Sequence, residues 1–327
     1  NNAGLENYWS YHSQSAGRAG TGSVNDYTGN LVFYTAIMNT TGARAPFDFS
    51  LTYNGYQSGS QFANGQKGLV YGLDWQSNLS QRIDPVTDPV LLSNNYRFIF
   101  TDEDGTQHYF VSDATDLSKF NDEDGLGLEI TTGGSPSDYY TLQASDGTKR
   151  IFNDSGYLHK ICDSNHNEVN VTDDGSKLTV IDGAGRNTAI EYDAATKKVT
   201  SVTEPYSDET KIKKTVFHYT GEQLTSITGP DSKIIQFIYD TENRLQKAIN
   251  IDGSYIQYSY YGIAGSDSMV KNRVNDATEY STAGETGNKV TFIYNPDNTT
   301  TFQYLKAGKT QTETYNFDNF GRATSVV

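Results

Sequence analysis

The sequence has few of the residues that cross-link a protein or insert it into a membrane. It contains a single cysteine, Cys162, in 327 residues, which excludes an intramolecular disulfide framework and a cysteine-based zinc site. No segment approaches the roughly twenty consecutive apolar residues of a membrane span. Apolar residues never recur at three-to-four spacing through a glycine-free window, so no helix of normal length is expected.

Hydrophobic residues are also scarce, because they make up 35% of the chain and the mean hydropathy is −0.62. The core must therefore use the 24 tyrosines and 15 phenylalanines, a composition that favours β-strands and predicts an all-β fold. The net charge of −15 repels phosphate backbones and anionic lipid. Nucleic acid is therefore excluded as an expected partner, as is a membrane surface.

A short aromatic-x-aromatic motif recurs in the second half of the chain. Spacing of two places both rings on one face of a strand. An aspartate or asparagine usually follows the motif, and its side chain can close a turn by bonding the backbone two residues on. These residues are the predicted structural framework of the repeat: Tyr192, Asp193, Phe217, Tyr219, Phe237, Tyr239, Asp240, Tyr258, Tyr260, Phe292, Tyr294, Tyr315, Phe317 and Asp318.

The strand after each turn opens with a second recurring phrase. It reads Val199-Thr-Ser-Val202, Leu224-Thr-Ser-Ile227 and Ala323-Thr-Ser-Val326. Apolar residues three apart do not fit the strict alternation of a strand, so the phrase predicts a bend or bulge.

Each repeat is predicted to be one β-hairpin. Most steps from one turn residue to the next are 19 to 23 residues, which fits two strands and two turns. A lone hairpin cannot bury its aromatic face, so the hairpins are expected side by side in one continuous curved or spiralling sheet. The longest step contains Gly262 to Gly287, which is predicted to be a surface excursion.

The sequence pattern divides the chain into two regions. Residues 1–150 are an irregular β-rich lead-in, with strand candidates at Leu31–Tyr34, Tyr96–Phe100 and His108–Val111. Residues 151–327 carry the regular repeats and are expected to continue the first region. The chain is interpreted as a piece of a longer polypeptide.

Two phrases resemble the Rhs or YD repeats of bacterial polymorphic toxins, which also occur in the teneurin cell-adhesion proteins. They are Phe237-Ile-Tyr-Asp-Thr-Glu-Asn-Arg-Leu245 and Tyr315-Asn-Phe-Asp-Asn-Phe-Gly-Arg-Ala323. Thr28-Gly-Asn-Leu-Val32 and Gly72-Leu-Asp-Trp75 are similar to the lead-in of wall-associated members. Individual units depart from the pattern, as where Thr220 replaces aspartate.

The resemblance implies that the repeats form the wall of a hollow shell. In such toxins the shell encloses a C-terminal effector domain of the same polypeptide, which is absent from this chain. The expected function is therefore a structural shell segment, secreted or exposed on a bacterial surface and used in bacterial competition.

The residues that usually carry chemistry do not assemble into a motif. The acidic clusters at residues 102–105 and 122–125 fail the register of a calcium-binding loop and are interpreted as solvated turns. The five histidines lack a ligand motif, and no nucleophile motif or phosphate-binding loop occurs. No catalytic residue, cofactor site or metal site is predicted, and the protein is not expected to be an enzyme.

Two other functions rank below the shell. The first is an adhesin-like module that binds wall or host glycan by stacking sugar on Tyr8, Trp9 and Tyr11. The second is a carbohydrate-active enzyme, for which no pair of carboxylates stands out among the 40 acidic residues.

Overall fold

The computed structural model describes residues 4–42, 44–56, 68–204, 212–262, 271–306 and 308–327. Strands make up most of the described chain. Its helical elements are the five-residue helix α1 (Pro89–Ser93) and the short 3-10 helix η1 (Gly17–Ala19). The prediction of an all-β protein is confirmed.

Twenty-two strands form one sheet in which each strand pairs antiparallel with the next along the chain. In chain order they are β6 (Arg82–Pro85), β7 (Tyr96–Thr101), β8 (Gln107–Ser112), β9 (Lys119–Asp122), β10 (Glu129–Thr132), β11 (Tyr140–Gln143), β12 (Lys149–Phe152), β13 (Leu158–Cys162), β14 (Glu168–Asp173), β15 (Lys177–Ile181), β16 (Asn187–Tyr192), β17 (Val199–Thr203), β18 (Lys214–Thr220), β19 (Gln223–Thr228), β20 (Ile234–Tyr239), β21 (Leu245–Ile249), β22 (Tyr255–Tyr260), β23 (Val274–Tyr280), β24 (Thr286–Tyr294), β25 (Thr299–Lys306), β26 (Lys309–Phe317) and β27 (Ala323–Val326). The predicted continuous curved sheet is confirmed.

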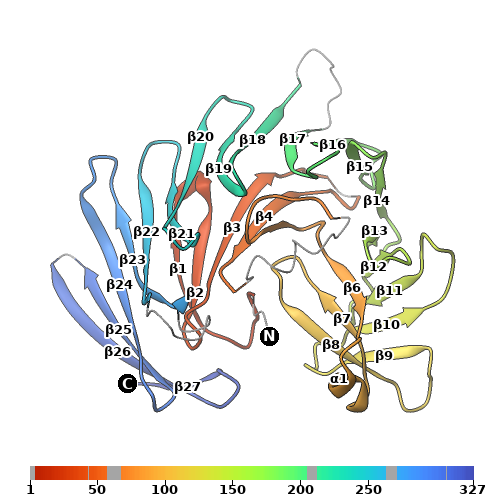
Figure 1. Cartoon of the computed structure of the whole chain (residues 1–327), viewed down its shortest axis with the longest axis horizontal. Coiled ribbons are helices and arrows are strands. Elements are labelled where there is room, and N and C mark those ends of the chain that lie inside the picture. Colours follow the sequence, from red (N-terminus) through yellow and green to blue (C-terminus); the bar gives the residue numbers. More distant parts are fainter. Residues whose placement is uncertain (1–3, 43, 57–67, 205–211, 263–270, 307) are drawn as a thin grey trace.

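The first strands of this long sheet coil back on themselves (Figure 1). The Ile83 amide in β6 donates to the Gly156 carbonyl, 3.0 Å away, just before β13 begins. A separate apolar core fills the coil, composed of Ile83, Phe100, Phe110, Phe120, Ile130, Tyr140, Leu142, Phe152 and Leu158.

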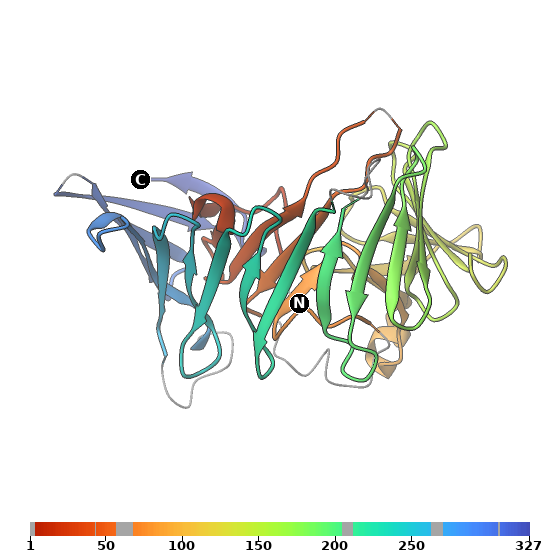
Figure 2. The ribbon, with the colours of Figure 1, turned by 90° about the horizontal axis from the view of Figure 1, so that it is seen from above.

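A second, five-stranded sheet lies on the concave side of the arc (Figures 1 and 2). Its strands also pair in chain order: β1 (Tyr11–Ser15), β2 (Thr21–Asn25), β3 (Leu31–Met38), β4 (Phe49–Asn54) and β5 (Trp75–Ser77). The main core lies between the two sheets, where Phe33 and Trp75 contact Phe237 of β20. A Cβ on Gly22 would lie 1.8 Å from the Tyr258 hydroxyl oxygen, so glycine is required for this close approach of β2 to β22. The N-terminal sheet therefore covers the inner face of the arc.

The change from one sheet to the other falls between Ser77 and Arg82. The change in sequence pattern falls later, at residue 150, well inside the long sheet. The two boundaries mark different properties, since β6 to β11 already belong to the long sheet but precede the regular repeats.

The predicted bulge recurs in six hairpins, where the pairing register skips one residue of the second strand. The skipped residues are His159, Thr200, Thr225, Gln246, Asn275 and Thr324. The bulge changes the phase of the pleat, so that Val199 and Val202, three residues apart, are both buried. Where the skipped residue is threonine, its hydroxyl donates to a carbonyl of the preceding strand, as Thr200 does to Glu191 at 3.1 Å.

Tyrosine hydroxyls join each hairpin to its predecessor. The second aromatic residue of a repeat donates to the carbonyl of the residue just before the preceding bulge. The pairs are Tyr219 with Val199, Tyr239 with Leu224, Tyr260 with Leu245 and Tyr294 with Val274, at 2.6 to 2.9 Å. Burial raises the pKa of each of these tyrosines well above its usual value, so they remain protonated donors.

The predicted turn residues Asp240 and Asp318 each close a loop and also bind an arginine. In the Asp240 turn, one carboxylate oxygen accepts the amides of Glu242 and Arg244, both at 2.9 Å. The other accepts Arg244 Nε at 2.8 Å, and the guanidinium lies over the Tyr260 ring. The pairs Asp182–Arg186 and Asp318–Arg322 repeat this four-residue arrangement.

The predicted surface excursion is partly wrong. Residues 263–270 lie outside the described residues, but Val274 to Tyr280 form β23, paired with β22 and β24. The sequence of this strand lacks alternating apolar residues, because only Val274, Ala277 and Thr278 are buried along it. The sequence pattern therefore does not predict the strand.

We expect the Tyr239 hydroxyl to contribute measurably to stability. It donates to the Leu224 carbonyl and accepts from Trp75 Nε1, both at 2.8 Å. Tyr239→Phe removes both hydrogen bonds and should lower the free energy of unfolding by about 1 to 3 kcal/mol, measured by urea unfolding. Tyr239→Ala also removes the ring and should cost about 3 to 5 kcal/mol. The control Tyr34→Phe, at a side chain that is 43% exposed, should be near neutral, and equal losses in the two Phe variants would contradict this.

The aspartate–arginine pair should matter in proportion to its burial. The Asp240 and Arg244 side chains are 14% and 12% exposed, whereas those of Asp318 and Arg322 are 25% and 55% exposed. Asp240→Asn should lower the free energy of unfolding by about 1 to 3 kcal/mol, since it leaves a mostly buried guanidinium without its anion. Asp318→Asn should have a much smaller effect, because solvent screens this more exposed pair. An equal effect at both positions in the same unfolding assay would refute the role of burial.

Candidate functional site

The framework residues predicted from the repeats contribute to the packing and the turns of the long sheet. Phe217, Phe237, Tyr258 and Phe292 are buried in the main core, and their partner tyrosines pack against it. Asp193, Asp240 and Asp318 occupy turns. None of the framework residues lines the cavity described below.

Tyr8, Trp9 and Tyr11 do not form a flat aromatic platform. The Tyr8 and Trp9 rings meet edge to face, with centroids 4.7 Å apart and planes at 70°. Trp9 Nε1 donates to the Phe320 carbonyl at 2.9 Å, which ties the N-terminal segment to the Asp318 turn. The Tyr11 hydroxyl donates to the Gly4 carbonyl at 2.9 Å. The polar edges of Trp9 and Tyr11 are therefore used in contacts within the chain.

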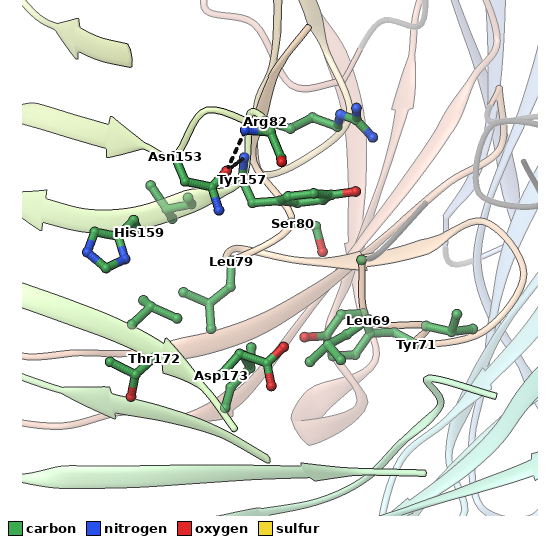
Figure 3. Close-up of a pocket in the computed structure, with 16 residues that line it drawn as sticks. Leu69, Tyr71, Leu79, Ser80, Arg82, Asn153, Tyr157, His159, Thr172 and Asp173 are labelled. Atoms are coloured by element: carbon green, nitrogen blue, oxygen red, sulfur yellow. Dashed lines mark hydrogen bonds between the residues drawn. The ribbon is translucent and has the colours of Figure 1, made fainter. Parts of the chain in front are cut away.

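A cavity of about 520 Å³ opens where β6, β13, β14 and residues 68–71 approach one another (Figure 3). Leucine and tyrosine side chains form much of its wall, including Leu69, Tyr71 and Leu79. The Arg82 guanidinium lies over the Tyr157 ring, 5.5 Å from its centroid.

The polar groups of this cavity do not form a recognisable reaction centre. Asp173 is the single carboxylate of the described lining, and it accepts a hydrogen bond from the Tyr192 hydroxyl. Glycoside hydrolysis ordinarily uses two carboxyl groups facing one another across the bond to be broken. The described lining offers one.

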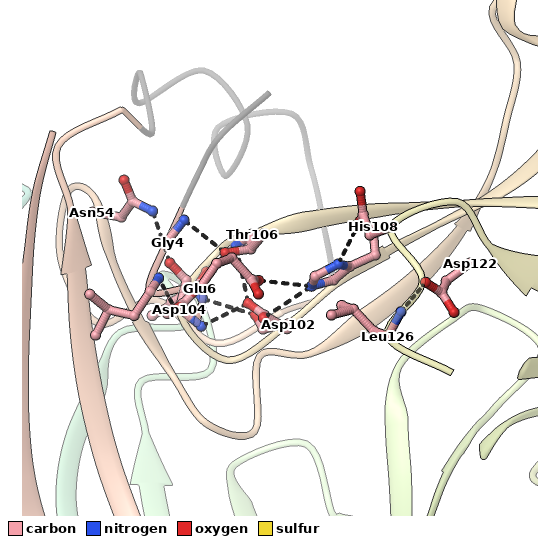
Figure 4. A network of polar contacts seen from close by, with 12 residues as sticks. Gly4, Glu6, Asn54, Asp102, Asp104, Thr106, His108, Asp122 and Leu126 are labelled. Atoms are coloured by element: carbon pink, nitrogen blue, oxygen red, sulfur yellow. Dashed lines mark hydrogen bonds and ion pairs between the residues drawn. The ribbon is translucent and has the colours of Figure 1, made fainter. Parts of the chain in front are cut away.

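A group of ionisable side chains surrounds His108 in β8 (Figure 4). His108 Nε2 lies 3.3 Å from an Asp102 carboxylate oxygen and 3.5 Å from one of Glu6. Its Nδ1 lies 3.2 Å from an Asp124 oxygen. The histidine is 3% exposed and Glu6 is 10% exposed. We call Glu6, Asp102, His108 and Asp124 the His108 cluster.

Three separate segments build the His108 cluster. Asp102 directly follows β7, and Asp124 lies in the turn between β9 and β10. Glu6 precedes β1 and is placed by two contacts: the Gly4 amide donates to Thr106 Oγ1 at 2.7 Å, and the Leu5 amide donates to Asp104. The interpretation of residues 102–105 as a solvated turn is wrong, because Asp104 is 9% exposed and the turn is covered by the N-terminal segment.

The charges of the His108 cluster perturb one another. Burial raises the pKa of Glu6 and that of Asp102 to about 7. Burial alone would lower the pKa of His108, but hydrogen bonds to Asp102 and Asp124 raise it to about 10. Glu6, Asp102 and His108 each offer one potential metal-ligand atom, and these atoms lie within 4.8 Å of one another. Both acidic turns are visible in the sequence, but their convergence on one histidine is not, because the contacts join residues in separate segments of the chain.

Another buried carboxyl group lies beside the Trp75–Tyr239 hydrogen bond. Burial raises the pKa of Asp74 to about 8, and its Oδ1 has no hydrogen-bond partner. Its backbone has a φ of 64°, in the left-handed region that asparagine accepts more readily than most residues.

Asp74 should make the protein less stable as the pH rises. The folded state keeps this proton up to about pH 8, whereas the unfolded chain loses it near the usual value of 3.8, so the free energy of unfolding falls across that window. Asp74→Asn removes the effect and should be about 1 to 3 kcal/mol more stable than the unchanged protein at pH 8. The gap should shrink towards pH 5, and parallel stability curves for the two proteins would contradict the assignment.

Among the described residues, no helix is long and apolar enough to cross a membrane. The sequence matches no protein-family profile and no curated protein.

Solved structures similar to this chain include components of toxin complexes. One is TcdB2-TccC3 without its hypervariable C-terminal region, with a TM-score of 0.28 and 9% identity over 90% of this chain and 19% of that one. Another is the Photorhabdus luminescens Tc holotoxin pore, with a TM-score of 0.31 and 10% identity over 94% of this chain and 16% of that one. A porin-like protein from Bacteroides uniformis scores 0.15, at 10% identity over 73% of this chain and 58% of that one.

The chain thus spans less than a fifth of the toxin-complex chains that it matches. These TM-scores are too low to assign it the fold of any of the three.

Proposed function

We propose that this chain is a wall segment of an Rhs/YD-repeat toxin shell, secreted or displayed by a bacterium, that encloses a C-terminal effector domain of the same polypeptide. The observation that carries the proposal is the uniform joining of successive hairpins. Strands β6 to β27 pair in chain order, and buried tyrosine hydroxyls connect each of four repeats to the one before. The proposal that this sheet encloses an effector rests on the resemblance of the repeat phrases to those of Rhs toxins.

The wall of a shell must keep proteases out and must resist local unfolding. The structure of the repeat meets both requirements. The strands from β7 to β26 each have a hydrogen-bonded neighbour on both sides, so their backbone is not available as an extended substrate for cleavage. The tyrosine hydroxyls bond to carbonyls next to the bulges, where the hydrogen-bond ladder of the sheet is interrupted. The N-terminal sheet covers the concave face of the arc and so adds a second layer there.

No specific observation favours the glycan-binding module. Its three candidate residues contact the chain itself, with Trp9 bonded to Phe320 and Tyr11 to Gly4. Isothermal titration with wall glycan fragments distinguishes the two functions, because a passive wall has no saturable sugar site.

Containment predicts that the wall protects the polypeptide that follows it. In the full-length gene product, limited proteolysis should leave the C-terminal effector intact while the sheet is folded and degrade it in denaturant. Tyr239→Ala should accelerate this degradation, whereas the control Tyr34→Phe should not. A C-terminal region cleaved as fast in the full-length protein as in isolation would overturn the proposal.

A further inference from the structure

The His108 cluster is arranged differently from an ordinary ion-pair network. One nitrogen, Nε2, faces two carboxylate oxygens at 3.3 and 3.5 Å. Both distances exceed the 2.7 to 3.2 Å of a good N–H···O hydrogen bond, so a proton on Nε2 would be shared between two weakly bonded acceptors. One oxygen of each carboxyl group and the imidazole nitrogen lie within 4.8 Å of one another, so all three atoms could contact one ion placed among them.

The same distances fit a bound cation. Zinc bonds nitrogen at about 2.0 to 2.1 Å and carboxylate oxygen at about 2.0 to 2.2 Å, which places neighbouring tetrahedral ligand atoms about 3.4 Å apart. The separations of Nε2 from Glu6 and Asp102 are close to this value. The imidazole is also oriented for the role, since Nδ1 faces Asp124 and can donate its proton there while Nε2 binds the metal.

The charge of the cluster favours a cation as well. Three carboxyl groups surround one imidazole, and in the described part of the chain none of them forms an ion pair with lysine or arginine. A divalent ion would offset this excess of negative charge in a buried site.

We propose that Glu6, Asp102 and His108 bind a divalent first-row transition-metal ion, with zinc as the best fit, and that Asp124 positions the histidine. An imidazole combined with two carboxylates suits zinc, whereas calcium and magnesium prefer oxygen ligands alone. The ion would fasten the N-terminal segment to the β7–β8 turn. It would thereby join the start of the inner sheet to the long sheet, two elements that meet here through Gly4, Leu5 and the Asp104 turn.

The first test is calorimetric titration of the EDTA-treated full chain with zinc chloride. We expect one equivalent to bind and the melting temperature to rise. Glu6→Gln and His108→Gln should each weaken binding by about 10-fold or more, and Asp124→Asn by about 10- to 100-fold without changing the stoichiometry. The controls His218→Gln and Glu222→Gln, at exposed side chains, should bind as the unchanged protein does.

Absence of binding at zinc concentrations up to about 1 mM would overturn the proposal. Equal affinity in Glu6→Gln, His108→Gln and the two controls would also overturn it, because the zinc would then be bound elsewhere. X-ray absorption spectroscopy of the unsubstituted, zinc-loaded protein tests the site without relying on a variant that must fold. It should show imidazole scattering with an otherwise oxygen shell, and an all-oxygen shell would refute the histidine ligand.

Discussion

The hydrogen bond from a tyrosine hydroxyl to the carbonyl before a bulge is the constraint on which the arc depends. A bulge interrupts the ladder and bends the strand, and it does so at the same position in six hairpins. Where the tyrosine of the next repeat reaches that carbonyl, the bend is held between two hairpins rather than within one. Regular curvature is the expected result, since each hairpin is joined to the last by the same contact.

The five-stranded inner sheet contacts the same tyrosine and bulge groups from the concave side of the arc. Trp75 donates to the hydroxyl of Tyr239, and the Tyr53 hydroxyl accepts the Leu245 amide at the start of the next phrase. Aromatic residues of the N-terminal region thus bind the same tyrosine and bulge groups that connect the repeats. The two sheets therefore share one core. We infer that the repeats pack correctly only when the five-stranded N-terminal sheet has also folded.

Most of the charge lies on turns, but the polar groups that are buried have particular positions. The Asp240–Arg244 pair closes a turn within one repeat, whereas the His108 cluster joins three segments separated by as many as 118 residues, from Glu6 to Asp124. Local pairs stabilise a repeat, and long-range clusters fix how separate parts of the chain meet. The His108 cluster is the more informative about ligands, because its three carboxyl groups outnumber its one imidazole and leave an excess of negative charge.

The sequence by itself determined the all-β class, the hairpin unit, the bulge and the aspartate turns. Each depends on residues two to four apart, and such local spacing dictates which side chains share a strand face or a turn. Only the tertiary structure decided that β1 to β5 cover the arc, that Val274 to Tyr280 form a strand, and that Glu6 meets His108. Those outcomes depend on contacts between residues far apart in the chain, and local periodicity carries no information about which distant groups meet when the sheet curves.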